Sequence, residues 1–323
     1  MLFRAVLPLL ALAPLLAAIG MRRFSAEAAP RPARVLMYHG IPSTDAAGFE
    51  RQMGYLRACF DVVPLSSLVP PVEDRPGRMR IALTFDDGLR NNVSVAYPIL
   101  RKLGLPATFF VCPQLIDRGQ WLWNQQARQR LKRLDAEARK KLALEAGSPS
   151  AEVEPFIDWM KSLEPSVRRT VEASVRKATP GFRPTFAERD AYDISRWEEL
   201  RGLDPQIVTI GSHTLTHPIL TTLTGEELET EIGGSRVVLE DKLQRPVELF
   251  AYPNGAQNPA VLACARRHYR GAVLAGPERV SPAPDPHLIP RDCAPRGILR
   301  LARNLLREMA APEPLWQEGS RQS

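Results

Sequence analysis

The chain has 323 residues, enough for one α/β domain of barrel size, and its 44% hydrophobic and 24% charged residues are typical of a soluble globular protein. The formal net charge of +7 favours an anionic partner only non-specifically, and no lysine- and arginine-rich run with interleaved aromatic residues indicates a nucleic-acid-binding surface. The four cysteines form no C-x-x-C pair, which excludes a zinc ribbon and a thiol redox motif.

Residues 1–30 are predicted to be a leader, either a signal peptide or a membrane anchor. The apolar stretch 1–20 is short for a membrane-spanning helix, and small residues around Ala28 offer a cleavage site. Arg22 and Arg23 lie between this stretch and that site, and an uncleaved anchor with these arginines would keep the domain on the cytoplasmic side. We expect membrane association in the cell envelope, periplasmic or at the inner membrane, with the cytoplasmic side left open.

From residue 31 to about 310, short apolar runs alternate with helix-like segments, before a C-terminal tail at 311–323. The expected strands are 34–41, 79–88, 106–112, 206–213, 247–255 and 271–276, and the expected helices are 49–60, 92–104, 224–244 and 258–269. Strands that alternate with helices indicate βαβ units and a parallel sheet. Seven or eight such strands would close into an α/β barrel.

The stretch from about 118 to 200 breaks this alternation. Residues 125–147 are rich in Ala, Leu, Arg, Lys and Glu and predict one long exposed helix, and residues 151–178 predict one or two more. Their charges are typical of a solvated helix face. We interpret this region as a helical insertion between two barrel strands, which forms a lid or a wall that faces the membrane or the substrate.

Two neighbouring carboxylates, Asp86 and Asp87, follow a predicted strand in the sequence TFDDG. Asp-Gly is a strong turn dipeptide, which explains Asp87 before Gly88 but not the second acid beside it. Adjacent carboxylates repel each other, so a cation or a proton is needed to separate their roles. A simple turn and a functional site both remain open for this pair.

Two of the five histidines, His213 and His217, lie four residues apart after another apolar strand. Either one alone is more often structural, but one helical turn or a tight loop would put both imidazoles on the same side. Together with Asp87 they form a set of two histidines and one carboxylate that leaves coordination positions open, as in catalytic metal sites. These ligands suit zinc, and nickel, cobalt, iron or manganese would also fit.

The chain resembles the polysaccharide deacetylases of the NodB-homology type, carbohydrate esterase family 4. The motifs that carry the resemblance are TFDDG (84–88), PATFFV (106–111), HTLTH (213–217) and FAYPNG (250–255), in the family's order. The resemblance covers residues 33–117 and 195–300, with the leader and the insertion outside it. It implies a distorted (β/α)7–8 barrel that removes acetyl groups from N-acetylated sugars with a divalent metal.

The resemblance also implies roles for single residues. Asp87, His213 and His217 would hold the metal and Asp86 would be the general base. A backbone N–H at Asn254 would donate to the oxyanion that forms during the reaction.

This sequence departs from the commonest family pattern at two positions. Ala251 stands where an arginine usually orients the catalytic aspartate, and no late histidine matches the usual general acid. The subgroup similar to poly-N-acetylglucosamine deacetylases has permuted motifs, with the acid histidine on the first strand, which LMYHG matches at His39. A packed core residue and a metal ligand are the alternatives for His39. Arg291 is the candidate replacement for the missing arginine, with a surface ion-pair residue as its alternative.

The expected function is therefore metal-dependent removal of acetyl from an N-acetylhexosamine unit of a bacterial glycan or a lipid-linked amino sugar. Cell-envelope polysaccharide, peptidoglycan and lipopolysaccharide modification are all compatible with this reaction. The alternatives are a catalytically inactive sugar-binding module on the same fold and a different metallohydrolase, such as a phosphoesterase. A nucleic-acid partner is not expected.

Overall fold

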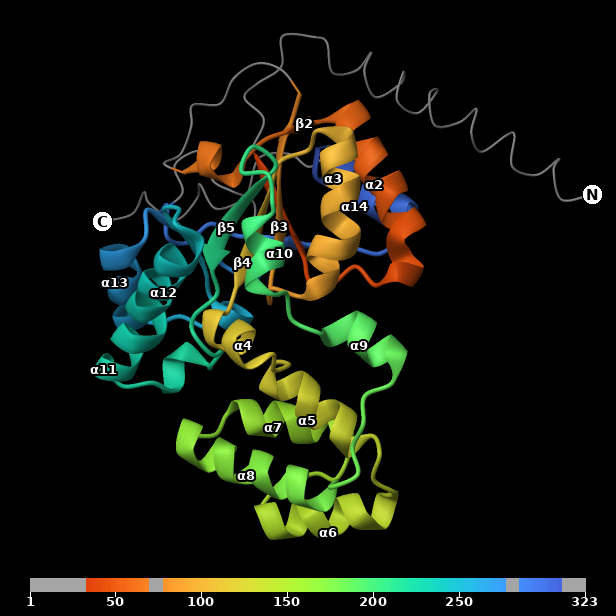
Figure 1. Cartoon of the computed structure of the whole chain (residues 1–323), viewed down its shortest axis with the longest axis vertical. Helices are drawn as coiled ribbons and strands as arrows, with labels where there is room; N and C mark the ends of the chain where they lie inside the picture. The colour runs from red at the N-terminus through yellow and green to blue at the C-terminus, as the bar shows by residue number, and fades with distance from the viewer. Residues whose placement is uncertain (1–32, 70–77, 277–284, 310–323) are drawn as a thin grey trace, which may run out of the picture.

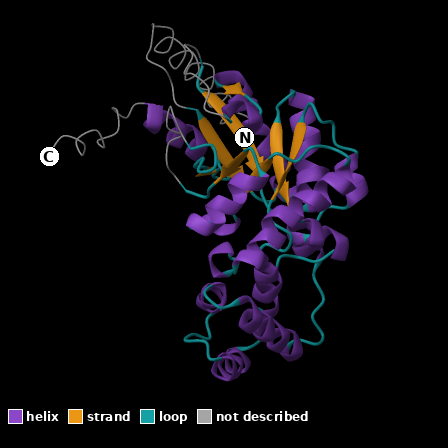
Figure 2. Ribbon diagram, turned by 90° about the vertical axis from the view of Figure 1, so that its left-hand side faces the viewer, coloured by secondary structure: helices purple, strands orange, loops and turns teal. Residues whose placement is uncertain are grey.

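The structure is a computed structural model that describes residues 33–69, 78–276 and 285–309. A curled sheet lies at its centre and helices surround it (Figures 1 and 2). The predicted leader (1–30) and C-terminal tail (311–323) lie outside the described residues. Within the described ranges, no helix combines the length and the apolar character needed to cross a membrane.

The strands form one parallel sheet, as the alternating pattern predicted. The strands are β1 (Arg34–Tyr38), β2 (Asp61–Val62), β3 (Arg80–Phe85), β4 (Ala107–Val111), β5 (Val208–Ser212), β6 (Leu249–Ala251), β7 (Gly271–Val273) and β8 (Asp292–Cys293). Their order in the sheet is β7-β6-β5-β4-β3-β1-β8, and β2 pairs with β3. Because all of these pairs are parallel, the C-terminal ends of the strands meet at one edge of the sheet.

The short segment 289–293 connects the two edges of this sheet. Its first residue, Ile289, bridges to Val273 of β7, and the Leu274 N–H donates to the Ile289 carbonyl oxygen at 2.8 Å. Its last part, β8, pairs with β1 through Leu36 and Asp292. The predicted (β/α) barrel is therefore confirmed, in the form of a curled sheet whose edges meet at this segment.

Helices cover the outside of the barrel. They are α2 (Ala46–Cys59), α3 (Tyr97–Leu103), α4 (Pro113–Arg118), α10 (Trp197–Arg201), α11 (Gly225–Leu228), α12 (Gly234–Leu243), α13 (Pro259–His268) and α14 (Ile298–Met309). A π-helical turn, η3 (Asn92–Ala96), begins the predicted helix 92–104, and another, η5 (Glu229–Gly233), interrupts the predicted helix 224–244. Gly104 ends α3 with a left-handed φ of 65°, which explains why a glycine stands there.

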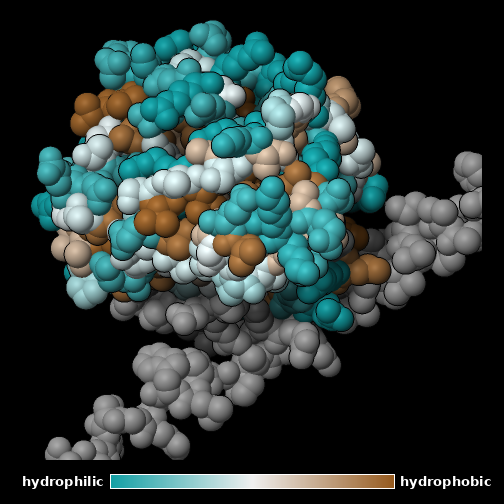
Figure 3. Space-filling model, turned by 90° about the horizontal axis from the view of Figure 1, so that it is seen from below, coloured by the Kyte–Doolittle hydropathy of each residue, from teal (hydrophilic) through white to brown (hydrophobic). Residues whose placement is uncertain are grey.

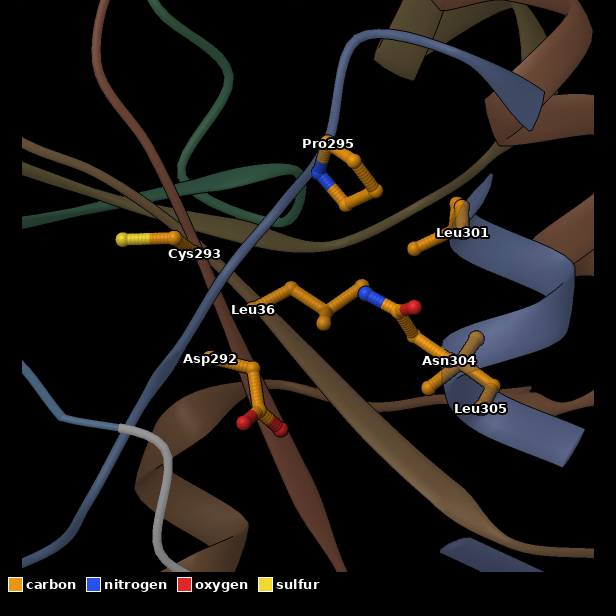
Figure 4. Close-up of a pocket in the computed structure, with 7 residues that line it drawn as sticks. All are labelled: Leu36, Asp292, Cys293, Pro295, Leu301, Asn304 and Leu305. Atoms are coloured by element: carbon orange, nitrogen blue, oxygen red, sulfur yellow. The ribbon is translucent and has the colours of Figure 1, made fainter. Parts of the chain in front are cut away.

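Alternate side chains along each strand enter two different cores. Val35, Ala82 and Phe110 belong to the cluster that fills the barrel, whereas Leu36 and Leu83 pack against the outer helices. This period of two directs every second residue of a strand into the barrel. A pocket beside α14 is lined by outward-facing residues of this kind, Leu36 among them, and so lies outside the barrel (Figure 4).

Gly211 on β5 makes room for the Phe110 ring inside the barrel. A Cβ atom at this position would lie 2.5 Å from two ring carbons of Phe110. We expect Gly211→Ala to lower the free energy of unfolding by about 1–3 kcal/mol, the usual cost of overpacking, as measured by urea denaturation. Gly54→Ala on α2 is the control, because nothing lies within 4 Å of its Cβ, and it should be neutral or stabilising. Equal stabilities of the two variants would contradict this account of the barrel interior.

The helical insertion lies between β4 and β5 and contains α5 (Trp123–Leu131), α6 (Ala136–Ala146), α7 (Val153–Lys161), α8 (Pro165–Ala178) and α9 (Phe186–Tyr192). Figure 1 shows α5 to α8 below the barrel, on the side of α4. These four helices bury a core of their own, which includes Leu131, Phe156 and Val171. On the underside of the molecule, hydrophobic patches are separated by hydrophilic side chains (Figure 3).

The prediction of one long exposed helix over 125–147 is wrong. The chain leaves the helix after Leu131 and begins α6 at Ala136, where the Asp135 side chain accepts a hydrogen bond from the Ala138 N–H at 2.8 Å. Asp135 is therefore an N-cap, a role that competes with a continuous helix. Both helices also bury residues, Leu142 among them, so neither is exposed on all faces.

Candidate active site

Three predicted ligands meet at the C-terminal edge of the barrel. Asp87 follows β3 and His213 follows β5, and β4 lies between these two strands. The Oδ1 atom of Asp87 lies 3.6 Å from Nε2 of His213 and 3.5 Å from Nε2 of His217. All three residues are buried. The structure thus brings together the two histidines and the carboxylate that the sequence pattern singled out.

The histidine pair lies in a tight loop held by hydrogen bonds rather than in a helical turn. Thr214 and His217 have left-handed φ values of 70° and 59°, which are unfavourable for residues with side chains. The His217 N–H donates to Thr214 Oγ1 at 2.9 Å. The N–H and the hydroxyl of Thr216 donate to the Glu231 carboxylate at 2.9 and 2.6 Å. These contacts hold the loop in the conformation that turns both imidazoles toward Asp87.

Both imidazoles are suited to act as neutral ligands. Burial lowers the pKa of His213 and that of His217 to about 4, so both rings are uncharged at neutral pH. His213 Nδ1 lies 2.7 Å from the Ala251 carbonyl oxygen, which can only accept, so Nδ1 donates and Nε2 keeps its lone pair for a metal. His217 Nδ1 is buried and has no hydrogen-bond partner among the described residues.

The donor set fits a divalent cation. The two distances to Asp87, 3.5 and 3.6 Å, are too long for good hydrogen bonds. They are close to the roughly 3.4 Å that separates ligands in a tetrahedral site with bonds of about 2.1 Å. One carboxylate and two neutral imidazoles suit zinc and the neighbouring transition metals. Asp87, His213 and His217 can therefore hold such an ion.

Arg291 forms a two-pronged ion pair with Asp86 inside the barrel. Its two terminal nitrogens donate to the two carboxylate oxygens, each at 2.6 Å, and its Nε donates to the Leu274 carbonyl oxygen at 2.8 Å. Burial alone would raise the pKa of Asp86, but the charge and hydrogen bonds of Arg291, together with the nearby His213 and His39, hold that pKa below its ordinary value. The reading of Arg291 as a surface residue is wrong, because its side chain is buried.

His39 directly follows β1, at the level of Asp86 on the neighbouring strand. Tyr38 pairs with Phe85, and the Asp86 N–H donates to the Tyr38 carbonyl oxygen at 3.0 Å. A protonated His39 lies near enough to contribute to lowering the pKa of Asp86 and that of His213. Its side chain is exposed, so the reading of His39 as a packed core residue is wrong.

Asn254 lies in η6 (Pro253–Gly255), directly after β6. Its φ of 55° is left-handed, a conformation that asparagine tolerates well, and its side chain is exposed. Because β6 pairs with β5 and the Ala251 carbonyl oxygen contacts His213, this turn lies at the same edge as the histidines. The proposed oxyanion contact of its backbone N–H stays a prediction.

The sequence profile of the polysaccharide deacetylase family matches residues 73–143 and 166–270, more than half of the chain. The chain belongs to the polysaccharide deacetylase family. Among curated proteins, it is 31% identical over 109 residues to "Putative polysaccharide deacetylase YxkH" of Bacillus subtilis (strain 168). That match covers 31% of this chain and 39% of YxkH, so it spans less than half of the relative's length.

Solved structures of deacetylases share the fold of this family member. Streptococcus pyogenes deacetylase PplD, solved in complex with acetate, aligns with a TM-score of 0.57 and 18% identity, over 88% of this chain and 100% of that one. IcaB from Ammonifex degensii aligns with a TM-score of 0.53 and 16% identity, over 81% and 91% of the two chains. At these identities the likeness establishes the barrel fold.

The family match has different boundaries from the predicted resemblance. It enters the insertion, over 118–143 and 166–194, which the motifs had placed outside the family. It also begins after His39 and ends before Arg291. The assignments of these two residues therefore depend on their positions beside Asp86 and not on the family profile.

Sequence patterns did not reveal three residues that hold the site together. Thr84 accepts from Arg291 at 3.1 Å and donates to the Leu36 carbonyl oxygen at 2.9 Å, and its inward position two residues before Asp86 could have indicated it. Glu231 binds Thr216, and Trp123 of the insertion donates to the His217 carbonyl oxygen at 3.3 Å. No local pattern marks these last two contacts.

A second group of potential ligands, Glu229, Cys264 and His268, lies on the outer helices of the described structure. The Arg267 guanidinium already donates to Glu229 at 2.6 Å, so a cation is in place and we assign no metal to this group. His287 is buried with its Nε2 2.8 Å from the Tyr269 carbonyl oxygen, a structural contact. Of the five histidines, only His39 remains to serve as an acid beside Asp86.

Proposed function

We propose that this protein is a metal-dependent hydrolase that removes acetyl from an N-acetylhexosamine unit of a bacterial glycan. The observation that carries the proposal is the pairing of Asp86 with Arg291 beside the buried cluster of Asp87, His213 and His217. One carboxylate belongs to the cluster and the other stays outside it, held ionised. Membership of the polysaccharide deacetylase family supports the same reaction.

Asp87, His213 and His217 would hold the metal. A divalent cation bound there supplies Lewis acidity to the acetamide carbonyl and to a water molecule. The Asp86 carboxylate, with Oδ2 at 4.0 Å from His213 Nε2, lies beside the cluster and takes the proton of the attacking water. Arg291 fixes the orientation of this carboxylate and keeps it ionised, so that it can act as a base.

His39 and Asn254 complete the proposed machinery. His39 is exposed, follows β1 beside Asp86 and donates the proton that the leaving amine needs. The backbone N–H at Asn254 donates to the oxyanion on the acetyl carbon. Both residues follow strands that end at the same edge as the proposed metal ligands.

Replacing His39 with glutamine tests the role of the acid. We expect His39→Gln to lower kcat by about 10²- to 10⁴-fold, the usual contribution of general acid catalysis, with unchanged zinc affinity. His268→Gln is the control, because His268 is bonded to Glu229 on the outer helices, and it should retain full activity. Loss of zinc from His39→Gln would instead indicate that His39 is a metal ligand. Unchanged turnover would show that His39 is not the general acid.

The substrate is proposed to be either a polymeric N-acetylated glycan or a lipid-linked amino sugar of the cell envelope. The solved deacetylase PplD binds acetate, the product expected of this reaction. The predicted leader supports an enzyme that works at the inner membrane or in the periplasm. The insertion, beside the barrel edge that carries the site, would then form a wall facing the glycan or the membrane.

Acetate and free amine released from a panel of substrates test this proposal. The panel contains N-acetylglucosamine oligomers, peptidoglycan and undecaprenyl-linked N-acetylhexosamine, with metal content measured on the same protein. We expect one class to release acetate with close to one metal ion per chain. A metal-loaded protein that binds these glycans but hydrolyses none of them would be an inactive sugar-binding module. Hydrolysis of chromogenic phosphate esters alone would make it a phosphoesterase.

A further inference from the structure

The helical insertion contacts the histidine loop through the indole group of Trp123. Trp123, the first residue of α5, donates its N–H to the backbone carbonyl oxygen of His217 at 3.3 Å. The same ring is buried and belongs to the core of the insertion, together with Leu131 and Phe156. One side chain therefore connects the core of the insertion to the backbone of a proposed metal ligand.

Arg168 of α8 braces this indole ring. Its guanidinium carbon lies 4.6 Å from the centroid of the Trp123 ring, a stacking contact that favours a planar cation. Arg168 is itself buried and donates to Glu172 at 3.1 Å on the same helix. Trp123 is thus fixed by two helices of the insertion before it reaches the barrel.

The imidazole of His217 depends on its backbone for orientation. Metal-binding histidines usually donate their second ring nitrogen to a neighbouring acceptor, as His213 does to Ala251. His217 Nδ1 has no such partner among the described residues, and its φ of 59° is unfavourable. The His217 ring packs edge-on against the His213 ring, with centroids 4.8 Å apart, so contacts to the His217 backbone help to set where its Nε2 lies.

The His217 loop is held from two sides. On the barrel side, Glu231 accepts two hydrogen bonds from Thr216 and its backbone carbonyl oxygen accepts one from the Leu215 N–H at 3.2 Å. On the other side, Trp123 bonds to the carbonyl oxygen of His217. The barrel and the insertion hold consecutive residues of one loop, so both contribute to its conformation.

We propose that Trp123, braced by Arg168, is a positioning residue that holds the His217 backbone so that its imidazole meets Asp87 and His213. The role assigned to Trp123 rests on the metal site of the proposed function. Through this residue the insertion helps to position a metal ligand, in addition to any contact that the insertion makes with substrate.

Trp123→Phe in the full chain tests this role, because it removes the indole N–H but keeps a ring for Arg168 and for the core. Zinc affinity is measured on the metal-free protein by competition with a chromophoric chelator. We expect zinc to bind about five- to tenfold more weakly, the effect of one buried hydrogen bond whose acceptor is left unpaired. Trp159→Phe is the control: its ring packs edge-on against Phe156 in the same core, and zinc affinity should not change.

Arg168→Lys is a second variant that keeps the charge but removes the planar face over Trp123. We expect it to weaken zinc binding about two- to threefold, less than Trp123→Phe does. The Tm of each metal-free variant is measured alongside. If Trp123→Phe binds zinc as tightly as the wild type, or weakens it only as much as Trp159→Phe does, Trp123 has no positioning role.

The zinc measurement separates this inference from the proposed function. It needs no substrate, so a wild-type protein that binds zinc but releases no acetate would contradict only the deacetylase proposal. Unchanged zinc affinity in Trp123→Phe would contradict only the role of Trp123. A wild-type protein that binds no zinc or other divalent metal would contradict both the deacetylase proposal and the role of Trp123. The measurement on the wild type alone would show this result.

Discussion

Replacing Asp86 with asparagine is expected to abolish hydrolysis while leaving the metal site loaded. Asparagine has nearly the same shape as aspartate but cannot accept a proton from the attacking water. We expect kcat to fall by about 10²- to 10⁴-fold, the range attributed to general base catalysis. Because Asp87, His213 and His217 are unchanged, metal content should equal that of the wild type.

Acetate release and metal content, measured on the same preparation, check this prediction. Asp158→Asn is the control, since Asp158 is a largely exposed residue that forms an ion pair with Lys161 on α7, and it should retain full activity. An active Asp86→Asn enzyme would assign the base to another group. Loss of metal in this variant would instead make Asp86 a ligand, which the arrangement around Arg291 does not predict.

Replacing Arg291 with methionine is expected to affect stability and the pH profile together. The change leaves the Asp86 carboxylate buried without its partner, and breaking a buried ion pair in this way costs about 3–5 kcal/mol of unfolding free energy. Arg296→Met is the control, because its side chain is 85% exposed and its pair with Asp45 should contribute about 0–1 kcal/mol. Urea denaturation measures both variants.

The pH dependence of the Arg291→Met effect has a definite sign. In the wild type the lowered pKa of Asp86 stabilises the fold above the unfolded-state pKa of about 3.9, and this contribution is lost as the pH falls. Without Arg291, burial raises the pKa of Asp86, so the base is protonated over more of the acidic range. The acidic limb of the kcat/KM profile should therefore move to higher pH, and the stability difference from the wild type should shrink in acid.

The double variant Asp86→Asn/Arg291→Met separates the ion pair from other contacts of Arg291. With a neutral side chain at position 86, removal of the arginine no longer strands a buried charge. We expect the arginine change to cost clearly less in this background than in the wild type. Equal costs in both backgrounds would mean that Arg291 stabilises the barrel through Leu274 and Thr84 rather than through Asp86.

The metal-ligand set could be predicted from the sequence because it depends on local patterns. An apolar run before Asp87 and another before His213 place both residues at strand ends, and parallel strands bring such ends to one edge. The same periodicity predicted the barrel. The sequence offered Arg291 only as a candidate partner of Asp86. The two residues are 205 positions apart, and local spacing patterns do not predict contacts over such a separation.

Two features of the insertion could not be predicted from the sequence: the break between its first two helices and its contact with the site. Its composition indicated helices, but the break between α5 and α6 depends on one capping residue, Asp135, in a charged segment. Its contact with the site is a hydrogen bond between Trp123 and His217, 94 residues apart. Amphipathic patterns report which face of a helix is buried but not which loop it meets.

Acetate and free amine released by the protein before and after metal removal test the central claim most directly. A metal-loaded protein acting on an N-acetylhexosamine glycan should release the two products in equal amounts. Chelation should stop the reaction, and added divalent metal should restore it. Hydrolysis that continues unchanged in the chelated protein, or no release of acetate from any acetylated glycan by the loaded protein, would contradict the account.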